Sequence, residues 1–374
     1  MTSYSRRTCL QAILGGAAVK GIAALNGPSG LLPRLRADEL ELSNLYVDDD
    51  VDQAIKNGVK YLVSAARGNG AIVDRGHDVA MTALAIMAMA SVGIEPGAYN
   101  EASLRMSQAI DFVLDARNQD AQGYFGKVDG SRMYGHGIIT LMLTEMLGMG
   151  ATQEQNKRIH HSLEKAIKLI LAAQDVRKSL KLAGGWRYTP TASDSDLSVS
   201  VWQLMALRSA KNDGLDVPAS AIDNAIEYLQ NSYTAPSNAR GEQQVGGFSY
   251  TPGHHHPSFT MTSAGLLAMQ VCGQYESPMV KGAAEWLLQH PPRTRERFFH
   301  YGLYYYAQGM HQAGGQYAKR ADTVVPSLLL DIQEPRGSWL ARGSEEKNIG
   351  RVYSTSLSIL SLSVRYRYLP IYQR

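Results

Sequence analysis

Cysteine is nearly absent from this chain of 374 residues, which contains only Cys9 and Cys272. Cys9 lies in an N-terminal segment that we expect to be removed, so the mature protein can form no internal disulfide. The chain has no Cys-x-x-Cys pair, which excludes the common cysteine-based zinc and haem sites. Cys272 stands in an apolar stretch, and we expect it to be a small core residue.

Several other signatures are missing. The chain has no Gly-x-Gly-x-x-Gly, Gly-Lys-Ser/Thr or Gly-x-Ser-x-Gly sequence, which argues against dinucleotide-binding, phosphate-loop and nucleophile-elbow enzymes. Five of the 37 basic residues precede Asp38, where there are no acids, so from Asp38 onward 32 basic residues face 34 acidic ones, a net charge of −2. This balance gives no reason to expect a nucleic-acid partner. After the leader, no run of about 20 apolar residues could span a membrane.

The first 37 residues have the pattern of an export signal. Paired Arg6 and Arg7 precede a modestly apolar stretch, residues 10–25, which Lys20 interrupts, and a tail rich in Pro, Gly and small residues follows. This pattern predicts a twin-arginine-type signal peptide and linker over residues 1–37, followed by one domain over residues 38–374. The expected location is periplasmic or otherwise extracytoplasmic. A cytoplasmic amphipathic N-terminal helix is the alternative.

The rest of the chain is a repeat. The same helix of small and apolar residues recurs six times, at spacings of about 40 to 63 residues. The copies are TALAIMAMASVG (82–93), GIITLMLTEMLG (137–148), SVWQLMALRSAK (200–211), TSAGLLAMQVCG (262–273), GLYYYAQGMHQA (302–313) and TSLSILSLSVRY (355–366).

An amphipathic helix precedes each apolar one, as in LEKAIKLILAAQ (163–174) and AIDNAIEYLQNS (221–232). An amphipathic helix can face water, whereas a helix that is apolar all round must be enclosed. We therefore predict an all-α fold, an α/α toroid in which six hairpins form an α6/α6 barrel. The rival is an open helical solenoid, which usually has shorter and more uniform repeats without the long glycine-rich loops of this chain.

Those loops carry a resemblance. In LLLDIQEPRGSW, Gln333 ends an outer helix and Trp339 follows closely, which resembles the QW repeat of terpenoid cyclases and protein prenyltransferases. Looser copies pair Gln174 with Trp186, Gln230 with Phe248 and Gln119 with Phe125. The resemblance implies an α/α toroid. An amide that bonds free backbone groups at a helix end, beneath an aromatic ring, is a suitable joint between hairpins, so we interpret these as structural residues.

The catalytic motifs of that superfamily are altered here. GGFSYTPG (246–253) is similar to a stretch of prenyltransferase β-subunits, where a zinc-binding His follows; the matching position here is Thr260. The nearest match to the family's Asp-x-Cys zinc pair is Asp194-Ser195-Asp196, which has no thiolate, so we do not expect protein prenylation. The same residues resemble the Asp-x-Asp-Asp acid motif of squalene cyclases without its last acid. For that motif the resemblance implies a carboxylic acid that protonates an alkene, with aromatic rings such as Trp202 and residues 304–306 lining the cavity.

All inner helices of a toroid run the same way, so the loops before them should gather at one mouth of the ring. We predict catalytic roles for Asp194 and Asp196, and a divalent-metal cluster of His254, His255 and His256 with these two acids. Capping of a helix by Asp196, a solvated tip at the three histidines and structural roles for His77 and His136 are the alternatives. The other residues predicted to line the ligand site or its rim are His77, Asp78, His136, His300, Arg351, Tyr353 and Trp202.

The sequence thus predicts a protein that binds, and in one version of the hypothesis transforms, an isoprenoid or other apolar small molecule in a central cavity. The alternatives are a non-catalytic binding or interaction module and a carbohydrate-active α/α-barrel enzyme. A divalent metal is the only cofactor with any sequence support. Peripheral contact with a membrane and a protein partner stay open.

Overall fold

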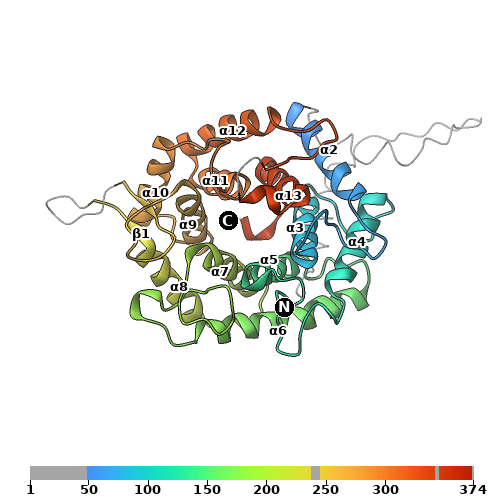
Figure 1. Cartoon of the computed structure of the whole chain (residues 1–374), viewed down its shortest axis with the longest axis horizontal. Coiled ribbons are helices and arrows are strands. Elements are labelled where there is room, and N and C mark those ends of the chain that lie inside the picture. Colours follow the sequence, from blue (N-terminus) through green and yellow to red (C-terminus); the bar gives the residue numbers. More distant parts are fainter. Residues whose placement is uncertain (1–48, 237–244, 342–344, 373–374) are drawn as a thin grey trace, which may run out of the picture.

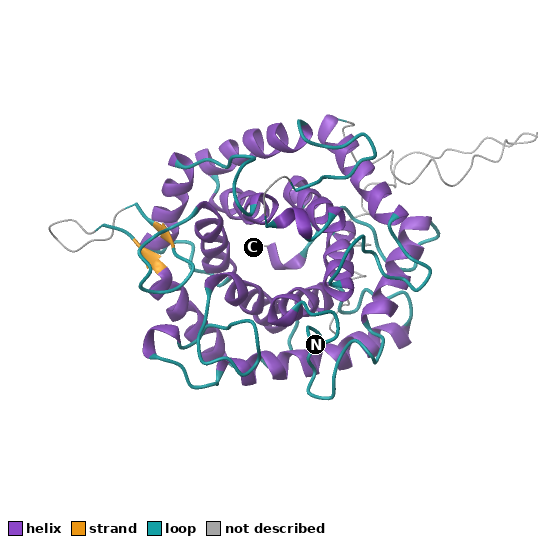
Figure 2. Ribbon diagram, viewed as in Figure 1, coloured by secondary structure: helices purple, strands orange, loops and turns teal. Residues whose placement is uncertain are grey.

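The computed structural model describes residues 49–236, 245–341 and 345–372 (Figure 1). Within these residues, twelve α-helices form two concentric rings (Figure 2). The predicted leader, with Arg6, Arg7 and Cys9, lies outside the described residues. None of the helices that the structure describes combines the length and the apolar character needed to cross a membrane.

The inner ring consists of the six predicted apolar helices, α3 (Asp78–Ala90), α5 (Arg132–Glu145), α7 (Leu197–Asn212), α9 (Phe259–Val271), α11 (Phe299–Ala313) and α13 (Arg351–Leu362). The outer ring consists of α2 (Asp50–Ser64), α4 (Glu101–Val113), α6 (Gln153–Gln174), α8 (Ala219–Ser232), α10 (Pro278–Gln289) and α12 (Gly315–Leu330). The last inner helix packs against the first, and α12 contacts α2. The predicted closed toroid is therefore confirmed, and the open solenoid is wrong.

Burial follows the sequence pattern. Every residue of α9 is buried, whereas α8 buries Ala221, Ile222, Ala225 and Leu229 along one face. This spacing places the apolar side chains of an outer helix on a single stripe, and the opposite stripe faces water. The core therefore lies between the rings and within the inner one.

Irregular elements are short. A two-stranded antiparallel sheet pairs β1 (Tyr233–Thr234) with β2 (Gly247–Phe248) after α8. The 3₁₀ turns are η2 (Leu180–Leu182), η3 (Glu346–Asn348), η4 (Ser363–Tyr366) and η5 (Pro370–Tyr372). The last two follow α13 and lie in the middle of the ring (Figure 1).

A glutamine joins neighbouring hairpins at three places. Gln333 donates from Nε2 to the carbonyl of Gly337, at 2.9 Å, and to that of Ala54 on α2, at 2.9 Å. Gln174 and Gln119 make the same pair of bonds to their own loop and to the next outer helix. Trp186 and Trp339 donate their indole N–H groups to carbonyls of α6 and α12. Gln230 is exposed, while its predicted companion Phe248 is buried against Tyr233.

The loops also cap their neighbours. In five of the six inner helices that the structure describes, a loop of the next hairpin accepts hydrogen bonds from the first free N–H groups. The acceptors are Asp129 for α3, the Tyr188 carbonyl for α5, the Tyr250 carbonyl for α7, Glu346 for α11 and Asp74 for α13. Because Asp74 precedes α3 and caps α13, this pattern also closes the ring.

Candidate functional site

The N-terminal ends of the inner helices meet at one end of the ring, which we call the mouth. Asp196 is the N-cap of α7 and is completely buried. Its Oδ1 accepts hydrogen bonds from the Val199 N–H at 2.9 Å and the Ser198 hydroxyl at 2.6 Å. Its Oδ2 pairs with the guanidinium of Arg187 at 3.1 Å. Both oxygens are therefore occupied by donors from the protein itself.

Arg187 links the two predicted acids. It contacts Asp194 at 3.3 Å through Nε, and its guanidinium lies over the ring of Tyr188 at 4.7 Å and that of Tyr250 at 5.6 Å. The two tyrosine hydroxyls are 2.6 Å apart. Asp194 is 56% exposed, so the two acids stand in different environments although they are one residue apart. This arrangement is a cation held between two aromatic rings.

Burial is the main influence on the titration of Asp196. Loss of water raises the pKa of this carboxyl, and the donors Ser198, Val199 and Arg187 oppose that rise. The three donors favour an ionised carboxylate. Asp196 thus acts as a cap and as the partner of Arg187, the alternative that the sequence left open.

The two buried histidines of the predicted rim have ring nitrogens that contact the protein itself. His136 accepts a hydrogen bond from the Phe125 N–H at Nδ1, and its Nε2 lies 3.2 Å from the Ala166 carbonyl of α6. His300 lies 3.0 Å from the hydroxyl of Ser358 on α13. Burial lowers the pKa of His136 to about 4 and that of His300 to about 3. Both are therefore buried, neutral residues with partners in the protein, which for His136 is the structural role that the sequence left as an alternative.

The other predicted rim residues form contacts that hold the loops and helix starts in place. His77 is exposed, precedes α3 with a positive φ of 60°, and contacts the Asp129 carbonyl at 2.9 Å. Asp78 pairs with Arg67, and Arg351 pairs with Glu334 at 2.8 Å. Tyr353 donates its hydroxyl to Glu346, which also caps α11. Of these four residues, Tyr353 is buried, whereas His77, Asp78 and Arg351 are at least partly exposed.

The predicted metal cluster is not formed. His254, His255 and His256 are exposed in the loop between α8 and α9, whereas Asp196 is buried. Among the residues that the structure describes, no three His, Cys, Asp or Glu side chains converge as metal ligands. The sequence run PGHHHP is the solvated loop tip of the alternative interpretation.

Aromatic rings fill the centre of the toroid. Trp202 of α7 stacks on Tyr304 of α11, with centroids 5.8 Å apart and an angle of 10° between the planes. Tyr301 and Tyr305 pack edge to face at 4.9 Å, and both also contact Trp202. Tyr134 of α5 lies 5.9 Å from Tyr301, although α5 and α11 stand on opposite sides of the ring (Figure 1). The open central cavity that we predicted is therefore filled at this level.

Two polar groups in this aromatic cluster are poorly paired. The Trp202 indole N–H and the Tyr305 hydroxyl are buried without a hydrogen bond of good geometry, and both interact with the Tyr301 hydroxyl. An unpaired buried polar group costs about 1 to 3 kcal/mol, so such groups are rare in folded proteins. Burial raises the pKa of Tyr305 and Tyr134 well above the usual range, which keeps both phenols protonated and able to donate.

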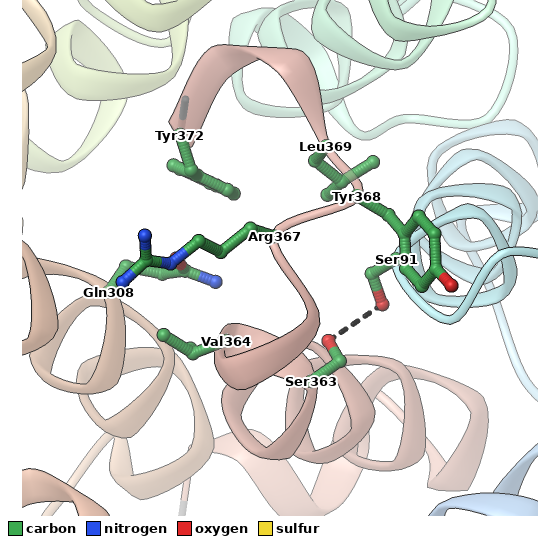
Figure 3. A pocket seen from close by; sticks show the side chains of 8 residues that line it. All are labelled: Ser91, Gln308, Ser363, Val364, Arg367, Tyr368, Leu369 and Tyr372. Atoms are coloured by element: carbon green, nitrogen blue, oxygen red, sulfur yellow. Dashed lines mark hydrogen bonds between the residues drawn. The ribbon is translucent and has the colours of Figure 1, made fainter. Parts of the chain in front are cut away.

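The opposite end of the ring is closed by the chain itself. Residues 363–372, which we call the plug, follow α13 and cover the C-terminal ends of the inner helices. Leu369 and Ile371 are buried there, and the Tyr372 hydroxyl bonds to that of Tyr304. A hollow of about 10 Å³, large enough for one water molecule, lies between the plug, Ser91 and Gln308 (Figure 3).

Sequence reasoning missed the residues that organise both ends. Arg187, Tyr188 and Tyr250 lie in two loops that only the ring brings together, and Tyr372 lies after the last periodic helix. The available signal for Arg187 was its place beside Trp186 in the loop that precedes the two acids. Tyr301 and Tyr134 each stand near the start of a predicted inner helix, which could have indicated the ring axis.

No protein-family model matches the chain, and no curated protein matches its sequence. In structure, the chain is similar to an inactive variant of the α-1,6-mannanase GH76A of Salegentibacter sp. HEL1_6 in complex with α-1,6-mannotriose, with a TM-score of 0.58 and 7% identity, covering 86% of this chain and 100% of that one. It is also similar to a variant of the type II terpene cyclase MstE from Scytonema in complex with geranylgeranyl dihydroxybenzoate, with a TM-score of 0.52 and 15% identity over 86% and 98% of the two chains.

A protein from Actinoplanes gives a TM-score of 0.51 at 15% identity, over 85% of this chain and 100% of that one. Identities this low show a shared fold and nothing finer. The chain has a terpenoid cyclase-like α/α toroid fold, as the resemblance implied.

Proposed function

We propose that the protein binds an apolar small molecule of isoprenoid type at the aromatic cluster in the centre of the ring. The observation that carries this proposal is the cluster of stacked rings on the axis, in which Trp202 Nε1 and Tyr305 Oη form no hydrogen bond of good geometry and interact with the Tyr301 hydroxyl. A ligand oxygen would give these groups a better partner, whereas apolar side chains of the same volume would fill such space at no polar cost.

The chemistry of the cluster indicates what kind of ligand fits. Aromatic faces from Trp202, Tyr301 and Tyr304 bury alkyl chains, and the indole N–H is a hydrogen-bond donor only. A matching ligand has a branched apolar body and one oxygen acceptor. The substrate named for MstE, geranylgeranyl dihydroxybenzoate, has this combination of isoprenoid chain and polar head.

Binding without transformation is the better supported version. An acid that protonates an alkene needs a carboxyl proton directed at the substrate, but both oxygens of Asp196 accept from protein donors. Asp194 is exposed at the mouth and is engaged with Arg187. Neither acid is available as a proton donor to the ring centre in this arrangement.

Titration of the purified chain with geranylgeraniol, followed by intrinsic tryptophan fluorescence, tests the proposal. We expect saturable quenching that is lost in Trp202→Phe and retained in Trp286→Phe, because Trp286 lies on the outer helix α10. Hexadecanol should bind at least ten-fold more weakly if the branched chain is recognised. Absence of saturable binding by calorimetry as well as by fluorescence would contradict the proposal.

A carbohydrate ligand at the mouth is the second candidate. It is favoured by two exposed groups that both contact Arg187, the carboxylate of Asp194 and the ring of Tyr250, since carboxylates and aromatic rings together suit sugar hydroxyls and faces. The similar mannanase is described as inactive when two adjacent aspartates are replaced. Saturation-transfer NMR with α-1,6-mannotriose distinguishes the two candidates. If a carbohydrate binds at the mouth, the unaltered protein gives a signal and Asp194→Asn does not.

A further inference from the structure

We infer that the plug, residues 363–372, occupies the entrance of the ligand chamber, and that a ligand reaches the aromatic cluster by displacing it. This inference rests on the proposed function and adds the route and the competitor. It assigns the C-terminal end of the inner helices, rather than the mouth, as the side of access.

The plug touches the cluster directly. The ring of Tyr372 packs edge-on against Tyr304 with centroids 6.5 Å apart, their hydroxyls are hydrogen-bonded, and Tyr304 stacks on Trp202. Leu369 and Ile371 are 4% and 5% exposed. The plug therefore presents a phenol with branched apolar side chains beside it. This is the same chemistry as the proposed ligand, so the two compete for one space.

The attachments of the plug divide it at Arg367. Before this residue, Arg365 forms an ion pair with Asp49, and both Arg365 and Tyr366 bond to Asp52, so this part is held firmly to α2. Arg367 itself has a positive φ of 55° and separates η4 from η5. A non-glycine residue in this conformation is uncommon and marks a sharp change of chain direction.

From Arg367 onward the chain contacts the inner wall of the ring. Arg367 contacts His311 at 3.2 Å, and Tyr372 contacts Tyr304. Leu369 and Ile371 add apolar burial, beside the small hollow that Ser91 and Gln308 line (Figure 3). A ligand that supplies equal apolar area and one hydroxyl would replace these contacts, because apolar burial is not directional.

Toward the mouth, side chains of the barrel itself cross the axis. Tyr134 and Tyr301 meet across the axis, and the Tyr301 hydroxyl donates to the Ser198 carbonyl at 3.1 Å. These rings belong to the helices of the barrel, so moving them would unpack the inner ring. Residues 367–372 belong to no inner helix, so their departure would break their contacts with α7 and α11 and leave the helices of the barrel packed on one another.

Geranylgeraniol binding to four forms of the full chain tests the inference: the unaltered protein, Tyr372→Ala, Tyr372→Phe and a version ending at Arg367. We expect the Kd to fall at least ten-fold in Tyr372→Ala and in the shortened chain, and only two- to three-fold in Tyr372→Phe, which keeps the ring. Tyr99→Ala, which alters a fully exposed tyrosine, should leave the Kd unchanged.

The outcomes separate the two proposals. Binding that is equally tight in all forms contradicts access through the plug and leaves the proposed function intact. Absence of binding in any form contradicts both the access route and the proposed function. If the shortened chain does not fold by circular dichroism, the two Tyr372 variants carry the test alone. Where it folds, a peptide of residues 368–374 added in trans should raise the Kd back toward that of the unaltered chain, and failure of the peptide to compete contradicts a shared space.

Discussion

At the scale of the residue, one position shows how different side chains perform the same task. Thr82, Ser200, Thr262 and Thr355 each accept a hydrogen bond from the backbone N–H of a residue in the loop before their helix. His136 takes this place in the second hairpin and accepts from the Phe125 N–H. A neutral imidazole can do so because the proton sits on Nε2 and is donated to Ala166.

This role makes the protein sensitive to acid. Burial lowers the pKa of His136 from about 6.5 to about 4, so the unfolded chain takes up the proton first as the pH falls. The contribution of His136 to the free energy of unfolding is complete above pH 6.5 and is lost between pH 6.5 and 4, to a total of about 3 kcal/mol.

Urea denaturation between pH 7.5 and 4.5 measures this loss. His136→Thr, which restores the side chain used in the other hairpins, should show a shallower decline than the unaltered chain. As the pH falls, His300 also lowers the free energy of unfolding, whereas buried Asp196 and Glu346 raise it. The quantity that reports on His136 is therefore the difference in the free energy of unfolding between the two proteins at each pH. Identical pH profiles of the two proteins would refute the claim that His136 makes the fold sensitive to acid.

The two acids of the mouth should differ sharply in their effect on stability. Asp196→Ala removes a helix cap, worth about 1 kcal/mol, and leaves Arg187 without its buried partner, so we expect a loss of about 2 to 4 kcal/mol. Asp194→Ala removes only an exposed pairing and should cost less than about 1 kcal/mol. Chemical denaturation of both variants checks this, and equal losses would disprove it.

At the scale of the element, the glycine of each joint explains why the loops are rich in this residue. Gly337 has a φ of 87°, and a Cβ on it would lie 2.3 Å from the Asn57 carbonyl of α2. Gly123 and Gly184 face carbonyls of α6 and α8 in the same way. The positive φ and the close approach together let the loop reach the neighbouring outer helix.

A matched pair of substitutions separates these two requirements. Gly253 has a φ of 86° but faces open space, so Gly253→Ala should cost only the backbone term of about 1 kcal/mol. Gly337→Ala also forces a clash with the backbone of α2, and we expect it to lower the free energy of unfolding by at least about 3 kcal/mol. Thermal and urea unfolding of the two variants provides the comparison. Similar losses would mean that the joint tolerates a side chain.

The helices and their order were predictable from the sequence because every hairpin consists of an amphipathic helix followed by an apolar one. The joints between hairpins were predictable from the spacing of Gln333 and Trp339. The role of His136 was not predictable, since its partner Ala166 belongs to the next outer helix. The plug was missed because the predicted helix 355–366 ran over its first four residues and residues 367–372 have no helical period. The filled ring centre depends on Tyr134 and Tyr301 meeting across the axis. Local patterns predict elements, whereas contacts across the ring depend on its closure.

At the scale of the whole molecule, closure means that no hairpin is terminal. Gln333 joins the last outer helix to the first, and Gln174 joins two neighbouring helices in the middle of the chain, through the same two bonds. In an open stack a terminal joint would be weakly held and could unfold separately. In a closed ring the two joints are equivalent, so each should contribute similarly to one cooperative transition.

We therefore expect Gln333→Ala and Gln174→Ala to lower the free energy of unfolding by similar amounts, about 1 to 2 kcal/mol, because each leaves two buried carbonyls with one partner fewer. Gln230→Ala, at the exposed end of α8, is the control and should change stability by less than about 0.5 kcal/mol. Denaturation followed by circular dichroism, together with hydrogen exchange of α2 and α13, measures both stability and cooperativity. Early exchange of α2 and α13 with a nearly neutral Gln333→Ala would mean that the ring opens at this joint before the rest unfolds, and closure would then contribute little to the stability of the fold.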